Sequence, residues 1–404
     1  MENIILFDND ARERLLPLTF TRPICELRVG ILTIREKWEK WLKGTASFIT
    51  QDYLSEKYDI VVSENNLIIN GAVMPSKELC ILINQMEDNE ALLHHGELIV
   101  AKVDKKQFER LMTEDDLEEL AGFELGDIPF LKIDSLPDIF VHNEAAIKAD
   151  FDLLTKGRKS QPISKTNQVL NPENIFLEKG ATVEFAILNA SKGPIYVGKD
   201  AEIMEGAMIR GAFALGDNSV VKMGAKIYGA TSTGPYCKLG GEVGNSVLLG
   251  YSNKGHDGYL GNSVLGEWCN LGADTNTSNL KNNYEEVKLW SYQKEGFVKT
   301  GQQFCGLIMG DHSKCGINTM FNTGTVVGIS ANVFGDGFPR NFIPSFSWGG
   351  ASGYSTYRTD KAFETAEKVM ARRKQELTAM DRVIMLKVSE ETAQFRRWEK
   401  KKKV

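Results

Sequence analysis

Apolar residues recur every six positions through most of the second half of the chain. One register contains Val197, Ile203, Ile209, Leu215, Val221, Ile227, Thr233 and Leu239. The residue four places after each of these is mostly small, as at Ala201, Ala207, Ser219, Ala225, Thr231 and Cys237, with Phe213 as the exception. A period of six fits neither an α-helix nor an ordinary strand. It predicts short strands joined by tight turns, with three hexads closing a triangular coil around an aliphatic interior.

The six-residue register shifts twice and then resumes. A second run contains Tyr259, Leu265 and Leu271, and a third contains Met309, Cys315, Phe321, Val327 and Val333. The breaks at 245–258 and 276–308 predict loops or insertions that leave the prism. Because loops on a rigid solenoid tend to carry function, we expect site residues in these two breaks.

Residues 1–155 show a different pattern, in which apolar strand-like runs alternate with helical ones. The predicted strands are Asn3–Phe7, Asn66–Asn70, Glu97–Val103 and Asp138–Val141, and the predicted helices are Ile34–Leu42, Lys77–Gln85 and Lys106–Met112. This alternation predicts an α/β domain with a parallel sheet. The turn-rich segment 156–162 marks its end. We therefore expect domains at 1–155 and 156–358, and a helical extension at 359–404.

The extension has helical spacing over 360–399, with Phe363, Ala366, Val369 and Met370 on one face. We expect one helix there that covers the prism or a neighbouring subunit. We expect the basic residues Arg396, Arg397 and Lys400 to Lys403 to form its solvated end.

Composition narrows the class of protein further. The chain has 404 residues, 42% hydrophobic and 25% charged, with a net charge of −6, so nucleic acid is not an expected bulk partner. No apolar run approaches the roughly 20 residues that span a bilayer. The first residues are not those of a signal peptide, and the six cysteines form no C-x-x-C pair, so we expect a reduced, cytoplasmic protein without membrane partners.

One histidine stands out as candidate chemistry. His256 lies in the first register break between Gly255 and Gly258, where a loop imidazole can approach a substrate closely. Histidine titrates near neutral pH, so it is the usual choice for a general base that takes a proton from an incoming nucleophile. The repeat half holds only one other histidine, His312, so a three-histidine zinc site within one chain is excluded.

The hexads resemble those of left-handed β-helix acyltransferases. The stretch from His256-Asp-Gly-Tyr259-Leu-Gly to Asn270-Leu-Gly-Ala273 is similar to the acetyltransferase half of the bifunctional N-acetylglucosamine-1-phosphate uridyltransferase / glucosamine-1-phosphate acetyltransferase family. The resemblance implies a left-handed coil, a homotrimer, acetyl-CoA as the donor and His256 as the general base. It also implies that Tyr259 and Asn270 hold the sugar phosphate, that Asn279 reaches the sugar, and that Ala273 faces the thioester. A basic residue of the family is missing from the following loop, and Lys281 is the candidate that replaces it there.

The first domain resembles the nucleotidylyltransferase half of the same family. Arg12-Glu-Arg14-Leu-Leu-Pro17-Leu-Thr19 and Arg22-Pro23 follow the first strand, as the family's signature loop does, but with few glycines. The resemblance implies nucleotide contacts from Arg14 and Arg22, with Arg28 replacing a missing lysine. The family's metal-binding aspartate corresponds to Ala72, which leaves Asp8 and Asp10 as candidate Mg²⁺ ligands.

The expected function is nucleotidyl transfer from a nucleoside triphosphate to a sugar 1-phosphate, of the UDP-N-acetylglucosamine or dTDP-sugar type, together with acetylation of an amino sugar phosphate. Two alternatives stay open. The β-helix could be only an oligomerisation scaffold, or the whole chain could be a sugar-nucleotide-binding protein without catalysis.

Overall fold

A computed structural model describes residues 3–114 and 120–399. The chain divides into two compact units, the first formed mainly by residues up to 134 and the second by residues from 135 onward. The short segments 16–21 and 28–31 belong to the second unit. The boundary expected at 155 stays a prediction, and it coincides with the end of a helix. No helix in the described part of the chain is long and apolar enough to cross a membrane.

The first unit contains a six-stranded sheet of order β2-β1-β3-β5-β4-β6. Its strands are β1 (Asn3–Phe7), β2 (Ala46–Ile49), β3 (Asn65–Asn70), β4 (Glu90–His94), β5 (Glu97–Asp104) and β6 (Ala121–Glu124). The predicted parallel arrangement is confirmed for β2, β1 and β3. The sheet as a whole is mixed, because β5 pairs antiparallel with β3 and forms a hairpin with β4.

Helices connect these strands much as the sequence predicts. They are α1 (Ala11–Arg14), α2 (Ile34–Leu42), α3 (Asp52–Ser55), α4 (Lys77–Gln85) and α5 (Lys105–Glu114), with a 3₁₀ turn η1 at Ile24–Glu26. A capping box starts α2, because the Thr33 side chain accepts from Glu36 N and the Glu36 carboxylate accepts from Thr33 N. Trp38 is buried, and its Nε1 donates to Val73 O at 2.8 Å, which fixes α2.

The strand predicted at Asp138–Val141 is wrong, because these residues form helix α6 (Asp138–Val141). The Asp138 carboxylate accepts from Ser135 N at 2.7 Å, and Pro137 occupies the N-cap, so the local turn chemistry overrides the apolar run. Helix α7 (Asn143–Thr155) follows and packs on the β-helix. The buried Asn143 amide donates to Ala230 O at 2.7 Å.

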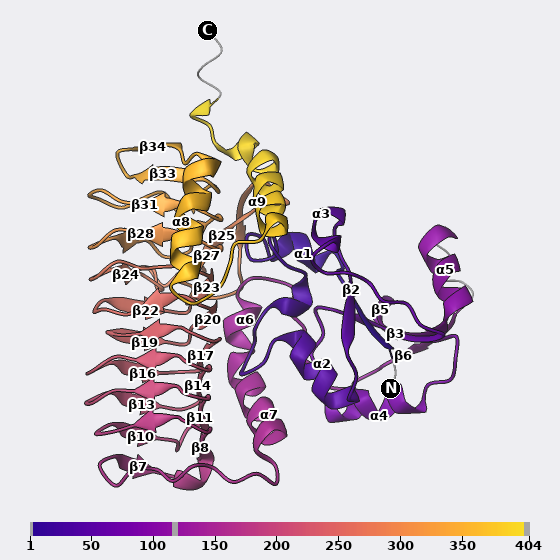
Figure 1. The fold of residues 1–404 in the computed structure, drawn as a ribbon. Coiled ribbons are helices and arrows are strands. Elements are labelled where there is room, and N and C mark those ends of the chain that lie inside the picture. Colours follow the sequence, from indigo (N-terminus) through magenta and orange to yellow (C-terminus); the bar gives the residue numbers. More distant parts are fainter. Residues whose placement is uncertain (1–2, 115–119, 400–404) are drawn as a thin grey trace. The chain divides into compact units, whose positions relative to one another are not determined.

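The second unit is a parallel β-helix, which confirms the predicted left-handed coil of hexads (Figure 1). Its largest face contains β8 (Ile175–Leu177), β11 (Ile195–Val197), β14 (Phe213–Leu215), β17 (Thr231–Thr233), β20 (Val247–Gly250), β23 (Val264–Glu267), β27 (Leu307–Met309), β30 (Thr325–Val327) and β32 (Phe342–Ile343). A second face contains β7 (Gln168–Leu170), β10 (Ile187–Asn189), β13 (Met208–Arg210), β16 (Lys226–Tyr228), β19 (Glu242–Gly244) and β22 (Tyr259–Gly261), and further along the chain β24 (Asn276–Thr277) pairs with β29 (Met320–Phe321). The third face begins with β9 (Thr182–Val183), β12 (Glu202–Ile203), β15 (Val220–Val221), β18 (Lys238–Leu239) and β21 (Asn253–Lys254). It continues with a second sheet of β28 (Lys314–Cys315), β31 (Asn332–Val333), β33 (Ser347–Gly350) and β34 (Gly353–Thr356). Isolated bridges at Asn270 connect the two sheets.

The interior of this prism is the row of residues that the hexads predict. The aliphatic positions from Val197 to Leu239 are buried there, and so is the third run from Met309 to Val333. The small positions are buried as well, and so is the exceptional Phe213. The second run is displaced by one residue at its start, because Leu260 occupies the core while Tyr259 is half-buried.

The loop or insertion expected at 245–258 is absent from this segment, which stays in the coil. Strand β20 pairs with β17 and β23, and β21 pairs with β18 and continues to the next coil through the isolated bridge between Asn253 and Asn270. The register shifts because turns are shortened, so that the core residues Leu239, Val243 and Leu248 stand four and five residues apart. The second break does contain an insertion, the antiparallel hairpin of β25 (Lys288–Ser291) and β26 (Gly296–Lys299).

The C-terminal extension is two helices and not one, α8 (Thr359–Ala371) and α9 (Ala379–Glu391), followed by a 3₁₀ turn η4 (Ala393–Phe395). The chain reverses between the helices, and Thr378 starts α9 with a capping box to Asp381. Arg396 is buried and donates to Ser345 O and Ser389 O, so it is part of the packing and not of a solvated end. Residues 400–404 lie outside the described part of the chain.

Candidate active sites

The loop that carries His256 is fixed from both sides by the coils of the β-helix. It follows β21, and the His256 side chain is exposed. On one side, a Cβ at Gly240 would lie 2.7 Å from the Gly255 carbonyl carbon, so only glycine lets the loop lie this close. On the other side, a Cβ at Gly258 would lie 2.2 Å from Thr275 O. The loop is therefore held between two neighbouring coils while the imidazole faces outward.

A buried lysine supports the same loop from the inside of the prism. The Lys254 side chain is 1% exposed, and its Nζ donates to His256 O at 2.5 Å and to Asp257 O at 2.9 Å. Burial lowers the pKa of Lys254 to about 8, although the nearby Asp257 carboxylate opposes this shift. Sequence reasoning missed this residue. The signal was a lysine at a hexad position that otherwise holds an aliphatic residue.

The structure brings Tyr259 and Asn279 together although 20 residues separate them. Asn279 Nδ2 donates to the Tyr259 hydroxyl at 3.0 Å and to Asn262 Oδ1 at 2.8 Å. Burial raises the pKa of Tyr259, so the phenol stays protonated at neutral pH. These three side chains form a polar row, in which Tyr259 and Asn262 come from the strand that follows the His256 loop and its end, and Asn279 comes from the start of the second break.

The remaining predicted residues of this site occupy neighbouring coils. Asn270 is exposed, and its Oδ1 accepts from Asn253 Nδ2 at 3.3 Å, one coil away. Ala273 is half-buried and its carbonyl accepts from Asn318 N at 2.8 Å. Lys281 stabilises its own loop, because its Nζ donates to Glu286 O at 3.0 Å. Asn270 therefore keeps its amide nitrogen available for a ligand, whereas the Lys281 ammonium is already engaged.

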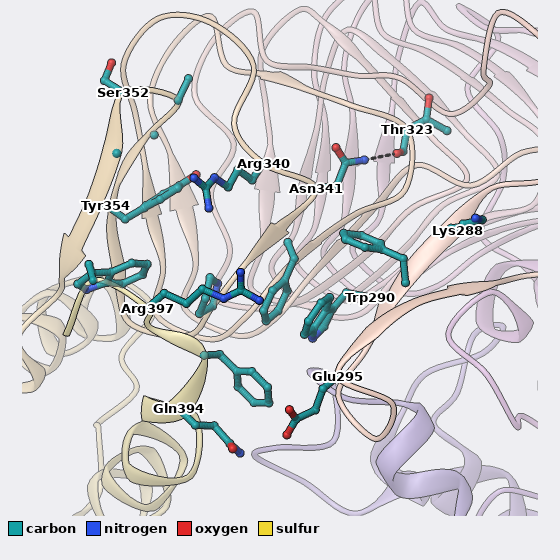
Figure 2. Close-up of a pocket in the computed structure, with 18 of the residues that line it drawn as sticks. Lys288, Trp290, Glu295, Thr323, Arg340, Asn341, Ser352, Tyr354, Gln394 and Arg397 are labelled. Carbon is teal, nitrogen blue, oxygen red and sulfur yellow. Dashed lines mark hydrogen bonds between the residues drawn. The ribbon is translucent and has the colours of Figure 1, made fainter. Parts of the chain in front are cut away.

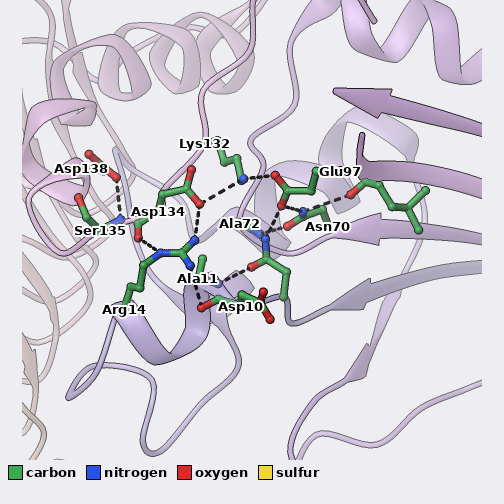
Figure 3. A network of polar contacts seen from close by, with 12 residues as sticks. Asp10, Ala11, Arg14, Asn70, Ala72, Glu97, Lys132, Asp134, Ser135 and Asp138 are labelled. Carbon is green, nitrogen blue, oxygen red and sulfur yellow. Dashed lines mark hydrogen bonds and ion pairs between the residues drawn. The ribbon is translucent and has the colours of Figure 1, made fainter. Parts of the chain in front are cut away.

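In the first unit, a chain of charged groups lies at the carboxyl ends of β1 and β3 (Figure 3). The Glu97 carboxylate accepts from Asn9 Nδ2 at 2.6 Å and from Asn70 Nδ2 at 3.0 Å. It also pairs with Lys132, whose Nζ lies 3.1 Å from the Asp134 carboxylate. Arg14, the predicted nucleotide-binding arginine, completes the chain.

Arg14 donates from Nε to Asp134 O and from Nη2 to Asp134 Oδ1, both at 3.0 Å. Its Nη1 also contacts Asp10 O at 3.3 Å. The guanidinium is therefore oriented by the backbone and one carboxylate at the end of α1. Ligand sites in open α/β sheets lie at this kind of edge, beyond the carboxyl ends of parallel strands. The sequence gives no sign of Glu97, Lys132 or Asp134, because no local motif connects them.

The other predicted residues of the first site have structural contacts. Asp8 accepts from Ile24 N at 2.7 Å and from Thr50 Oγ1 at 2.6 Å, and burial raises its pKa. Asp10 is exposed and Arg22 is buried. Arg28 belongs to the second unit, where its guanidinium donates to Leu249 O and Ile31 O.

No cluster of three or more His, Cys, Asp or Glu residues suited to a metal ion occurs within residues 3–114 and 120–399. Asp8 has its oxygens committed to Thr50 and to the backbone, and Ala72 supplies no carboxylate. These residues do not make an Mg²⁺ ligand set on their own. The Mg²⁺ role of Asp8 and Asp10 stays a prediction, and no step below depends on it.

Together, the two units define a class of protein in which an α/β domain with one candidate site precedes a parallel β-helix with a second candidate site. Residues 4–159 match the family described as "Sugar nucleotidyl transferase". The resemblance found in the sequence is confirmed by curated relatives. Over 145 residues the chain is 31% identical to the "Bifunctional sugar-1-phosphate nucleotidylyltransferase/acetyltransferase" of Sulfurisphaera tokodaii, which is 35% of this chain and 36% of the relative.

Shorter matches concern proteins named "Bifunctional protein GlmU". The identity is 34% over 87 residues with that of Methanococcus aeolicus and 37% over 87 residues with that of Methanocaldococcus jannaschii. These matches span 22% of this chain and 20% and 21% of the relatives, so the chain covers about a fifth to a third of the curated proteins it matches. Among solved structures, an Arabidopsis UDP-N-acetylglucosamine acyltransferase aligns over 53% of this chain and 80% of its own, with 12% identity and a TM-score of 0.27.

Proposed function

We propose that the chain is a bifunctional sugar-nucleotide enzyme, and that the second unit acetylates an amino sugar phosphate with acetyl-CoA. The observation that carries the proposal is the exposed His256, whose loop is held by Lys254 and by glycine contacts next to the Tyr259–Asn279 pair. The similarity of the chain to bifunctional nucleotidylyltransferase/acetyltransferases supports it.

In this reaction, the neutral imidazole of His256 accepts a proton from the ammonium of the amino sugar. The free amine then attacks the thioester carbon, and the tetrahedral intermediate collapses as the C–S bond breaks. The proton held by His256 passes to the leaving thiolate, and the nitrogen of the intermediate loses its second proton to solvent, so the products are the acetamide, the free thiol and one proton. Tyr259, Asn270 and Asn279 bind the sugar phosphate, and Ala273 lies against the thioester.

For the first unit, we propose nucleotidyl transfer to a sugar 1-phosphate. Arg14 is held by Asp134 at the carboxyl ends of β1 and β3, where it can bind the phosphates of a nucleoside triphosphate. The match of residues 4–159 to sugar nucleotidyl transferases supports this assignment. We also propose that the active form is a homotrimer in the cytoplasm, as the resemblance implies.

The test uses the full chain with glucosamine 1-phosphate and acetyl-CoA, and it follows the appearance of free thiol. We expect His256→Asn to lower the rate at least about a hundredfold, the usual effect of losing a general base. His95→Asn is the matched control, because His95 is also exposed, belongs to the first unit, and adopts a positive φ that asparagine tolerates.

A second assay measures pyrophosphate released from UTP or dTTP with a sugar 1-phosphate. If His256→Asn acetylates at the wild-type rate, the β-helix is a scaffold and the acetyltransferase assignment is wrong. If no combination of substrates releases pyrophosphate, the nucleotidyl transfer assignment is wrong.

A further inference from the structure

The second unit contains a pocket of about 990 Å³ (Figure 2). Four segments form most of its lining, namely the β25–β26 hairpin, the loop before β32, the turn between β33 and β34, and the segment 394–398 after α9, and Lys281 and Thr323 complete it. All four belong to the second unit, so the pocket is formed within one compact body.

Aromatic rings form much of the wall. The lining rings are Trp290, Phe297, Phe342, Tyr354, Phe395 and Trp398. Trp290 and Phe342 are stacked, with centroids 4.1 Å apart and planes 9° apart, and Tyr354 stacks on Trp398 at 5.7 Å. Phe297 is 47% exposed although it lies on this wall. A cavity bordered by flat and partly exposed rings suits a ligand that has a flat ring of its own.

The charge of the pocket is strongly positive. Lys281, Lys288, Arg340 and Arg397 line it, against the single carboxylate of Glu295. Within the described ranges, Lys288, Arg340 and Arg397 form no ion pair, whereas the exposed Arg14, Arg158 and Arg358 each do. Figure 2 shows Arg340 and Arg397 entering from different walls. Guanidinium groups without a protein carboxylate favour a phosphate, which they can bind in a bidentate manner.

We propose that this pocket binds a phosphorylated nucleoside, with the base against the aromatic wall and the phosphates on Arg340 and Arg397. A simple sugar phosphate would use the cations but not the rings, and an apolar segment would use the rings but leave the cations buried without partners. The wall residue Thr323 shares a hydrogen bond of 2.7 Å with Ser278, which lies next to Asn279. The bound nucleotide therefore lies beside the loop that we assign to the amino sugar.

Two sources of this ligand chemistry are compatible with the proposed function. One is the adenosine phosphate end of coenzyme A, and the other is the nucleotide consumed or produced by the first unit. The proposal does not depend on which reaction the chain catalyses, because the rings and the cations define the ligand class by themselves.

The experiment is isothermal titration calorimetry on the full chain with coenzyme A, ATP, UTP and UDP, and with inorganic phosphate as a separate ligand. The test variant is Arg340→Gln combined with Arg397→Gln, two exposed residues whose loss leaves the packed Arg396 in place. The charge control is Lys294→Ala, which removes an exposed cation of the same hairpin that does not line the pocket. A second variant, Phe297→Ala, removes only an aromatic contact.

We expect the dissociation constant of at least one nucleotide to rise about tenfold or more in the double arginine variant and several-fold in Phe297→Ala. Lys294→Ala and His256→Asn should bind that nucleotide as the wild type does. If coenzyme A is the affected ligand, the pocket holds the donor, and if UTP or UDP is affected, it holds the nucleotide of the first unit. The proposal is overturned if every nucleotide binds the double variant within twofold of wild type, or if only inorganic phosphate is affected.

Discussion

Lys254 offers the sharpest test of how the β-helix holds its candidate catalytic loop. Its ammonium lies inside the prism, in the row of core residues between Leu248 and Leu260, and donates to two backbone carbonyls. The substitution Lys254→Met keeps most of the aliphatic stem but removes the ammonium. Burial lowers the pKa from the ordinary 10.5 to about 8. This shift corresponds to about 3 kcal/mol in favour of the neutral amine in the folded protein.

The sign of the pH effect follows from this depressed pKa. Between pH 8 and pH 10.5 the unfolded chain keeps the Lys254 proton while the folded chain has lost it, so unfolding takes up a proton. The free energy of unfolding of the wild type therefore rises through this window relative to the methionine variant. From pH 7.5 to pH 9.5 we expect the difference between the two proteins to change by about 2 kcal/mol. Urea unfolding of both proteins at each pH measures it.

Lys314→Met is the matched control. The Lys314 Nζ donates to His312 O at 2.8 Å, and burial lowers its pKa to about 8 as well. Both variants should show the same pH-dependent difference, but only Lys254→Met should slow acetyl transfer, because only Lys254 holds the His256 loop. If the free energies of unfolding of the wild type and Lys254→Met differ by the same amount at every pH, burial does not lower the pKa of Lys254. If Lys254→Met acetylates at the wild-type rate, Lys254 does not position the His256 loop.

Four further substitutions, one of them a control, test other parts of the structure. Gly216→Ala places a Cβ 2.2 Å from Gly234 O and should lower the free energy of unfolding by about 3 kcal/mol. Its control is Gly224→Ala, where the space is open and only the φ of +69° opposes a side chain, so the loss should be about 1 kcal/mol. Equal losses of the two variants in urea unfolding would contradict this argument. Asn279→Ala removes the donor to Tyr259 and should lower kcat/KM for the amino sugar phosphate about tenfold, and an unchanged value would exclude Asn279 from binding. Glu97→Gln breaks the ion pair with Lys132 and should slow pyrophosphate release without affecting acetylation; slowing of both reactions would point to general unfolding instead.

The hexad pattern predicts the β-helix well because each hexad specifies its own core residue, and the same pattern is repeated along the chain. An aliphatic residue every six positions and a small residue at the corner specify the same coil wherever they occur, so Ile203 and Val327 are placed correctly without knowledge of their neighbours. The prediction fails where spacing changes. Strand-like composition at Asp138–Val141 is overridden by the turn at Pro137, in which the Asp138 carboxylate accepts from Ser135 N, and the shortened turns after Leu239 resemble an insertion in the sequence.

The candidate site residues also differ in whether a local sequence pattern connects them. His256, Tyr259 and Asn270 belong to one short motif, so the sequence groups them. Lys254 and the Glu97–Lys132–Asp134 chain could not be found in this way. The members of that chain come from β5 and from the segment after β6, and they meet only once the sheet has formed. For Lys254, the sequence contains one sign of a special role, which is a lysine at a hexad position that otherwise holds an aliphatic residue.

The shortened turns also explain why the candidate catalytic loop lies where it does. At one corner of the prism Tyr236, Tyr251, Trp268 and His312 stack in sequence, each with a positive φ. The spacing between the first two is 15 residues, not the 18 of a regular coil, yet their rings are 5.4 Å apart and nearly parallel. The stack keeps this corner aligned, so the loss of residues must be absorbed at the other turns. These shortened turns lie on either side of β19, and the coil then passes through the Tyr251 corner into β21, where the core position falls on Lys254 and the exposed position falls on His256. We therefore expect that restoring three residues between Leu239 and Leu248 would leave the β-helix folded but abolish acetyl transfer.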